Sequence, residues 1–274
     1  MDLFECAEHC LKLEDPMQKT SFSREIASKW RAGEISLNHC SSASAVNAPG
    51  KPEQPEIVQP REVPKRKLTH NEGRAAMVHA MAHIEWTAIQ LSWDNILRFR
   101  NLPYDFYSEW IQTAVEESHH FEELRSCLLE MGFDYGHFPV HDQLWQMALK
   151  TKDSLIERMG VVHRIMEARA LDVVPGIAGK FDQLGLGQVV KTLHLIANDE
   201  VGHVRSSTKW FSYGCHLIEA NPDQVFINLT REFFKGPLRG PFNLEARKNA
   251  GFTDVEIAFL SESQNETGKL QSTL

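Results

Sequence analysis

Long hydrophobic runs are missing from this 274-residue sequence. No window approaches the ~18 consecutive apolar residues of a membrane-spanning helix, so we expect no membrane contact of that kind. The first segment carries acidic residues at positions 2, 5 and 8, where a secretory signal needs an apolar stretch, so export is not expected. Basic residues number 29 against 37 acidic ones, and the net charge of −8 disfavours a surface that coats nucleic acid.

Cysteine is scarce and scattered. The odd set of five predicts no disulfide framework and favours a reducing, cytoplasmic location; the five are Cys6, Cys10, Cys40, Cys127 and Cys215. The first two are four residues apart, which predicts one helix face rather than a metal clip. No Cys-x-x-Cys pair is present, which excludes an iron site with cysteine ligands of the kind found in rubrerythrins.

Sustained period-two alternation, the pattern of β-strands, is also absent, which predicts an all-α fold. After residue 64 the prolines are sparse, and they leave four proline-free stretches: 65–102, 104–138, 140–174 and 176–221. Each stretch has room for a helix of ~25 residues and shows an apolar face with helical spacing. Four such helices predict a four-helix bundle.

Prolines cluster before that region, with five of the twelve at positions 49 to 64. Because each proline removes a backbone donor and restricts its predecessor, the segment 41–67 is predicted to be an extended linker or surface strap. Ser23 is the predicted N-cap of a helix that ends near Gly33. Residues 1–40 are predicted to form an N-terminal helical extension. Residues 68–260 are predicted to form the ferritin-like helical bundle with its short C-terminal helices, and residues 261–274 a polar, disordered tail.

Each of the four apolar stripes contains a glutamate. A buried, unpaired carboxylate costs several kcal/mol, so such residues are usually paired or bound to metal. Two of the four glutamates are followed three residues later by histidine, which lies on the same side of a helix and can bind the same metal ion. The six candidate ligands are Glu85, Glu117, His120, Glu167, Glu200 and His203.

The ligand pattern occurs twice. Glu85 precedes Glu117 by 32 residues, and Glu167 precedes Glu200 by 33. Two glutamates and two Glu-x-x-His pairs on four helices form the ligand set of ferritin-like di-iron and di-manganese proteins, and four carboxylates balance two divalent cations. Because oxygen donors outnumber imidazoles, iron or manganese is favoured over zinc or copper. We therefore predict two iron ions in a di-iron centre, with manganese as the alternative.

The second stripe allows two registers. Glu117 and His120 share their face with apolar residues, whereas Glu116 and His119 lie beside polar ones, which favours the first pair. A solvated face or a buried salt bridge would explain any single pair. The repetition in four stripes favours a metal site.

Other polar residues were compared with these six. His83 is two positions from Glu85 and points ~160° away from it, so it is not a ligand on that face. His163, one turn before Glu167, is expected to make a hydrogen bond in the core. Asp199 is a candidate partner of a ligating imidazole. His141 and Trp145, one turn apart at a helix start, are expected to cap and pack the helix, with pocket lining as the alternative. Arg239 and Arg247 are candidates for a lid or binding rim.

Several runs, in order along the chain, resemble the ferritin-like family catalogued as domain of unknown function 455. They are RAAMVHAMAHIEWTAIQL at 74–91, EESHHFEEL at 116–124, HDQLW at 141–145, MEARALDVVP at 166–175, NDEVGHV at 198–204 and GPFNLEARKNAGF at 240–252. The resemblance extends from about residue 10 to residue 260. It implies a ferritin-like fold with metal ligands at the same six positions. It does not identify the reaction or the substrate.

The function expected from this site is a di-iron oxidase or hydroxylase that activates O2 for a small-molecule substrate. A related ferritin-like enzyme hydroxylates a modified tRNA base, so a modified RNA base is an alternative substrate, although the net charge of −8 disfavours it. Alternative functions are a ferroxidase or iron-storage protein, a di-manganese protein acting on peroxide, and a non-catalytic structural bundle. The sequence leaves the electron donor and the oligomeric state open.

Overall fold

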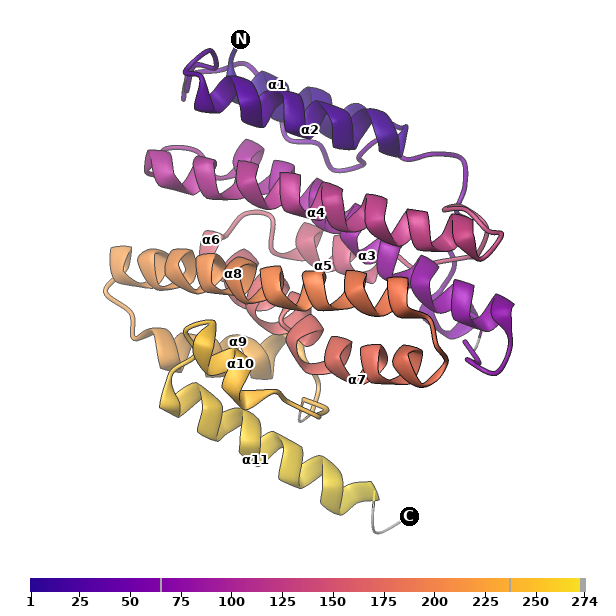
Figure 1. Cartoon of the computed structure of the whole chain (residues 1–274). Coiled ribbons are helices and arrows are strands. Elements are labelled where there is room, and N and C mark those ends of the chain that lie inside the picture. Colours follow the sequence, from indigo (N-terminus) through magenta and orange to yellow (C-terminus); the bar gives the residue numbers. More distant parts are fainter. Residues whose placement is uncertain (65, 237, 272–274) are drawn as a thin grey trace. The chain divides into compact units, whose positions relative to one another are not determined.

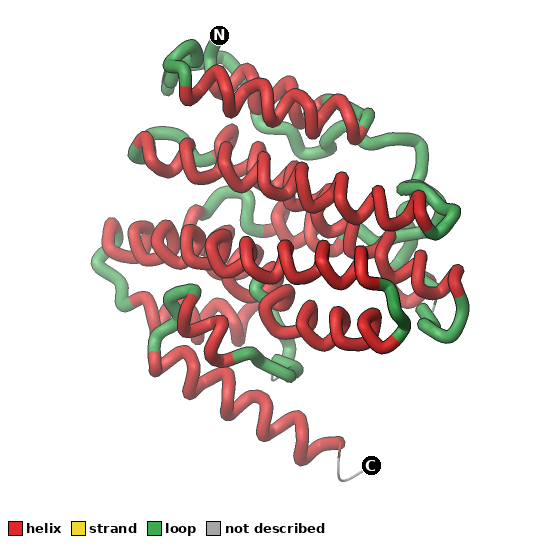
Figure 2. Tube along the Cα trace, in the orientation of Figure 1, coloured by secondary structure: helices red, strands yellow, loops and turns green. Residues whose placement is uncertain are grey.

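The computed structural model describes residues 1–64, 66–236 and 238–271, with side chains up to residue 263. Within these residues the chain is helical and has no β-strand, which confirms the all-α prediction; Figure 2 shows helices joined by loops. Two compact units divide the chain, Met1–Leu149 and Lys150–Leu274. The boundary between them falls inside the segment that we predicted to be a single bundle.

Helices of the N-terminal unit pack around one long pair. The described α-helices are α1 (Leu3–Lys12), α2 (Pro16–Arg31), α3 (Asn71–Arg98), α4 (Tyr104–Glu130) and α5 (Gln143–Lys150). Helices α3 and α4 contact each other along much of their length, α1 packs on α3, and α2 packs on α4 (Figure 1). Both long helices lie within the proline-free stretches that predicted them.

The start of α2 corrects one prediction. Helix α2 begins at Pro16, and the Asp15 side chain caps it by accepting a hydrogen bond from the Gln18 N–H at 2.8 Å. A cap followed by proline at the first helical position is a strong start signal. Ser23, predicted to be the cap, lies inside the helix, where its hydroxyl donates to the Lys19 carbonyl and accepts from the Trp93 indole at 2.8 Å.

The strap, residues 41–67, has no regular structure in its described part apart from the 3₁₀ turn η1 (Pro60–Glu62). Side chains of the unit hold its backbone carbonyls: Arg98 donates to Val46, and the Trp145 indole donates to Asn47 at 3.1 Å. Farther along, the Val58 N–H donates to the Val140 carbonyl at 2.8 Å. These bonds satisfy backbone groups that a proline-rich segment cannot pair within itself.

A buried lysine lies beneath the strap. Lys19 is fully buried, and its Nζ donates to the Leu11 and Gly50 carbonyls at 3.4 and 3.3 Å and lies 4.5 Å from the centre of the Trp86 ring. No carboxylate partner for it exists among the described residues. Burial lowers the pKa of Lys19 to about 8. The charged form of this side chain therefore destabilises the fold at neutral pH.

Because the folded chain releases the Lys19 proton near pH 8 while an unfolded lysine keeps it to pH ~10.4, the unfolded state binds more protons and the free energy of unfolding rises with pH. We expect a rise of about 1 kcal/mol between pH 7 and 9 that is missing in Lys19→Met. Burial raises the pKa of the Cys6 thiol to about 11. Because an unfolded thiol loses its proton near pH ~8.5, this group lowers the free energy of unfolding as the pH rises above that value. Urea titrations should therefore compare variant and wild type at each pH, with the exposed Lys12→Met as control; an equal rise in all three proteins would contradict the prediction.

The C-terminal unit contains one long helix and several short ones. Its described elements are α6 (Leu155–Glu157), the π-helical segment η2 (Arg158–Glu167), α7 (Arg169–Gln183), α8 (Gly187–Leu217), α9 (Pro222–Phe233), α10 (Leu244–Asn249) and α11 (Asp254–Gln271). Helix α7 packs on α8. Helix α11 continues through Gln271, into the segment 261–274 that we predicted to be disordered, and residues 272–274 lie outside the described part.

The third predicted helix, within 140–174, is wrong in its extent. The chain there forms α5, α6 and η2, and Pro175 lies inside α7 instead of ending a helix. Proline cannot donate to the carbonyl four residues earlier, which is that of Leu171. The Asn243 side chain donates to this carbonyl at 3.3 Å instead. A bond from a distant segment thus allows the helix to continue through proline.

Two buried ion pairs stabilise the C-terminal unit. Arg164 and Glu256 form two hydrogen bonds of 2.9 and 2.7 Å, and both side chains are about 1% exposed. Arg247 donates to Asp172 with distances of 3.0 and 2.8 Å and is equally buried. The Arg247 charge is thus paired inside the unit, and its side chain also lines, together with Arg239, a cavity of about 310 Å³, in agreement with the predicted binding rim. Arg239 is exposed.

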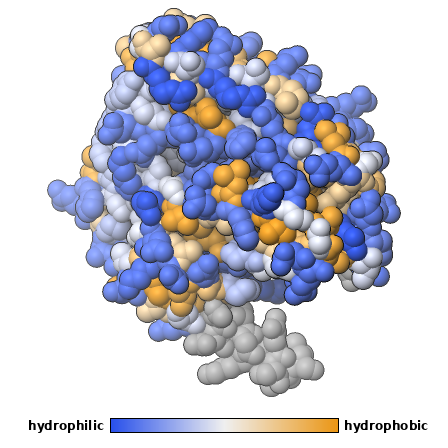
Figure 3. Space-filling model, in the orientation of Figure 1, coloured by the Kyte–Doolittle hydropathy of each residue, from blue (hydrophilic) through white to orange (hydrophobic). Residues whose placement is uncertain are grey.

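The described helices include none that is long and apolar enough to cross a membrane. On the face seen in Figure 3, hydrophilic residues predominate and apolar residues form separate patches among them.

Candidate metal centre

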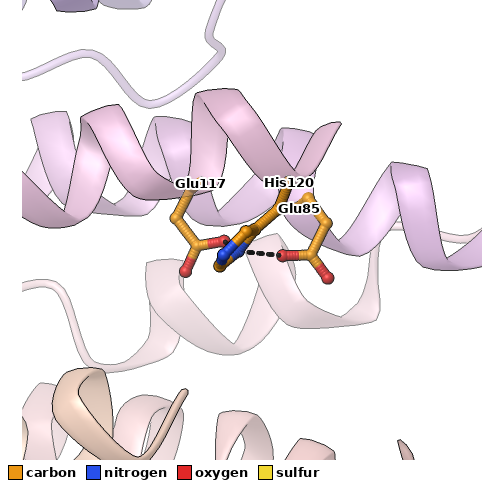
Figure 4. Close-up of side chains that lie close together, drawn as sticks. All are labelled: Glu85, Glu117 and His120. Carbon is orange, nitrogen blue, oxygen red and sulfur yellow. Dashed lines mark hydrogen bonds and ion pairs between the residues drawn. The ribbon is translucent and has the colours of Figure 1, made fainter. Parts of the chain in front are cut away.

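Three of the predicted ligands meet in the N-terminal unit. Helix α3 supplies Glu85, and α4 supplies Glu117 and His120, with exposed fractions of 6%, 3% and 0%. The His120 Nδ1 atom lies 3.4 Å from Glu85 Oε2 and 3.3 Å from Glu117 Oε2. Figure 4 shows the imidazole lying between the two carboxylates. One ligand atom from each residue lies within 4.8 Å of the other two, so a single ion can contact all three.

The local helix geometry explains this arrangement. Glu117 and His120 are three residues apart on α4 and therefore share one side of the helix, which packs against α3. The alternative register is more exposed: His119 lies at the surface, and the half-buried Glu116 accepts a hydrogen bond from Gln112 at 2.9 Å. The choice of Glu117 and His120 as the buried pair is confirmed.

Electrostatics make this cluster unfavourable without a cation. Burial raises the pKa of Glu85 well above its ordinary value, and the Glu117 carboxylate raises it further, against the opposing effect of His120. Glu85 Oε2 is buried and accepts no hydrogen bond from the described residues, although His120 Nδ1 lies 3.4 Å from it. A divalent cation would favour the charged form of both carboxylates and use this oxygen as a ligand. The donor set therefore fits a metal ion.

The C-terminal unit holds the other three candidates in two pairs. Glu200 and His203 lie on α8, each 6% exposed, with Glu200 Oε1 3.8 Å from His203 Nδ1. Glu167 is the last residue of η2, is half-buried, and forms a hydrogen bond with Nδ1 of His163. In the described part of this unit, Glu167 belongs to no group of three close ligating side chains. Three of the six residues are thus brought together, and Glu167 pairs with His163.

The π-helical turn was not predicted from the sequence. In η2 the Ala168 N–H donates to the His163 carbonyl, five residues earlier, at 3.3 Å. This wider turn lies where His163 and Glu167 meet, and π-helical segments are frequent at functional sites. The hydrogen bond of His163 agrees with the role expected for it.

A histidine and tyrosine cluster beside α3 was also missed. His83 points away from Glu85, as predicted, and its Nδ1 lies 2.8 Å from the Tyr135 hydroxyl. His79, one turn earlier, accepts from the Gly136 N–H at 2.9 Å and stacks on Tyr135. Burial lowers the pKa of His79 to about 4 and that of His83 to about 3, so both rings are neutral. Because these histidines are four residues apart, the sequence could have predicted that they share a second face of α3, away from Glu85.

Comparison with known proteins gives the family. Residues 12–258 match the family described as Protein of unknown function (DUF455). The chain belongs to the DUF455 family. A protein of Haemophilus influenzae, described as uncharacterized, is 37% identical over 218 residues, which are 77% of this chain and 76% of that protein. No solved structure matches. Membership of the DUF455 family confirms that part of the resemblance seen in the sequence.

Proposed function

We propose that this DUF455 protein is a ferritin-like metalloprotein that holds two iron ions and acts as an oxidase or hydroxylase of a small molecule. The observation that carries the proposal is the buried cluster of Glu85, Glu117 and His120, in which one ion can reach three ligand atoms. The repeated pattern of Glu167, Glu200 and His203 supports a second set with the same composition.

Charge and donor type support iron. Each half of the pattern has two carboxylates and one neutral imidazole, so a divalent ion for each half leaves no net charge. Carboxylate-rich sets with few imidazoles suit iron and manganese, and manganese is the alternative metal. The like-charge effect of Glu117 on Glu85 also supports a cation at this position.

A pair of ferrous ions supplies, when bound, electrons for the reduction of O2. The residues of the chain have separate tasks. Glu85 and Glu117 each offer two oxygens, so they can hold an ion as its charge changes. His120 is held on the same side as Glu117 by the helix spacing.

The test is a metal titration of protein purified without added metal. Anaerobic addition of Fe²⁺ should saturate at two ions per chain, and exposure to O2 should then give oxygen uptake and a near-ultraviolet absorption band of ferric iron. A parallel titration with Mn²⁺ measures the alternative. Absence of bound metal, or one ion per chain, would contradict the dinuclear proposal. Iron accumulating far beyond two per chain would favour storage instead.

A further inference from the structure

A second candidate site lies in the N-terminal unit, beneath the strap. A partly open cavity of about 200 Å³ lies between the strap, α3 and α5. On α3 its wall is formed by His83, Trp86, Thr87 and Gln90, whose spacing of three and four residues defines one helix face. Glu85 follows His83 by two residues and points about 160° away. The cavity and the metal cluster therefore lie on different sides of α3.

An unpartnered amide lines this cavity. Gln90 is 5% exposed, and its side chain makes no hydrogen bond with any described residue. A primary amide carries two donor hydrogens and an acceptor oxygen. The amide faces the cavity, where it can pair with water or with a polar ligand that enters.

His83 supplies a second polar atom. His83 Nδ1 and the Tyr135 hydroxyl share a hydrogen bond of 2.8 Å, and the hydroxyl has no other polar partner among the described residues. The other ring nitrogen, Nε2, is buried without a hydrogen-bond partner among the described residues. His83 and Gln90 are seven residues apart, about 10.5 Å along the helix axis. The cavity thus offers an imidazole nitrogen near one end and an amide near the other.

The remaining walls are mixed, with apolar rings beside the polar side chains of Lys51, Asp142 and Gln146. Trp86 and Trp145 contribute indole rings, and the strap contributes Pro49, Pro52 and Pro55. Trp145 is fixed by its hydrogen bond to the Asn47 carbonyl, at 3.1 Å. Indole faces favour stacking with planar rings. The volume is below the ~300–1,000 Å³ typical of sites for drug-sized molecules, which restricts the ligand to a small ring system.

We propose that this cavity binds a small planar heteroaromatic molecule, whose polar atoms at opposite ends pair with the Gln90 amide and the His83 imidazole. The ring lies against the indoles, and the strap covers it. This proposal uses none of the metal ligands and stands independently of the iron chemistry.

The experiment measures binding of four probes, adenine, cytosine, uracil and nicotinamide, to the full chain by ligand-observed NMR and calorimetry. At least one probe should bind saturably in the millimolar range or tighter. Gln90→Leu and Gln90→Met remove the amide while keeping an apolar side chain of similar size, and each should weaken that binding about tenfold or more. Gln112→Leu, at an exposed site on α4, is the matched control and should leave the affinity unchanged.

Stability measurements make these variants informative. Since the amide has no protein partner, both Gln90 variants should unfold at the same urea concentration as the wild type or a higher one. Toluene, a planar ring without polar atoms, should bind the wild type and the Gln90 variants equally. The proposal is overturned if none of the four probes binds, or if a folded Gln90 variant binds the best probe as well as the wild type does.

Discussion

Replacing Glu117 with glutamine is expected to stabilise the metal-free protein and to weaken metal binding by the N-terminal unit at least about 100-fold. The variant removes one of two carboxylates that are buried side by side, and the charge of Glu117 is among the causes that raise the pKa of Glu85. The gain in the free energy of unfolding should be about 1–3 kcal/mol at neutral pH. Metal binding falls because a neutral amide is a poor ligand for a hard cation.

The pH dependence provides a further check. A glutamate with a raised pKa keeps its proton in the folded state while the unfolded chain loses it above pH ~4.3, so wild-type stability falls as pH rises above this value. This fall should be smaller in Glu117→Gln, because Glu85 then loses one of the causes of its raised pKa. Urea titrations of chelator-treated protein from pH 4.5 to 7.5 measure the difference.

Glu116→Gln is the matched control, since it makes the same change on the neighbouring helix face. Glu116 is only half-buried and pairs with Gln112, so this variant should keep both the metal affinity and the stability of the wild type. If Glu117→Gln retained two ions per chain, the assignment of ligands on α4 would be wrong. If Glu116→Gln lost them instead, the other register would carry the site.

Replacing Glu256 with glutamine is expected to destabilise the protein by about 3 kcal/mol. The variant leaves the Arg164 guanidinium buried without its carboxylate, close to the rings of Phe211, Phe226 and Phe252. These rings attract the cation from several sides, but they do not replace two charged hydrogen bonds. Urea denaturation of wild type and variant under the same metal-free conditions measures the loss.

A double variant separates the loss of the pair from the cost of an unpaired charge. Arg164→Met with Glu256→Leu removes both charges, so it should be less destabilised than Glu256→Gln alone. Glu262→Gln, an exposed change on the same helix, serves as control and should have little effect. A double variant that is less stable than the single one would show that the pair itself, and not the isolated charge, determines stability here.

The helices that carry Glu85, Glu117 and His120 could be predicted because their apolar stripes are long. The neighbours of Glu117 and His120 identified the buried face of α4, since burial depends on the whole face and not on one residue. Ser23 was misplaced because Asp15 and Pro16 form a stronger start signal about two turns earlier. Asp15 was the better candidate cap, and this could have been seen from the sequence.

Other features depend on contacts that no local pattern reports. Pro175 ends a helix according to local rules, but the Asn243 side chain supplies the hydrogen bond that proline removes. No residue type in the sequence predicts the π-helical turn that ends at Glu167. The cavity beneath the strap requires Asn47 and Trp145 to meet, and a proline-rich segment has no periodicity from which its position could be predicted.

The bond between Asn243 and the Leu171 carbonyl also bears on how the chain is made. The two residues are 72 positions apart, so a ribosome adding ~5–20 residues per second completes Leu171 roughly 4–14 s before Asn243. During that interval the Leu171 carbonyl lacks its Asn243 partner. Assembly of this helix is therefore completed only when the segment before α10 has emerged, and a chain cut short before residue 243 would never complete it.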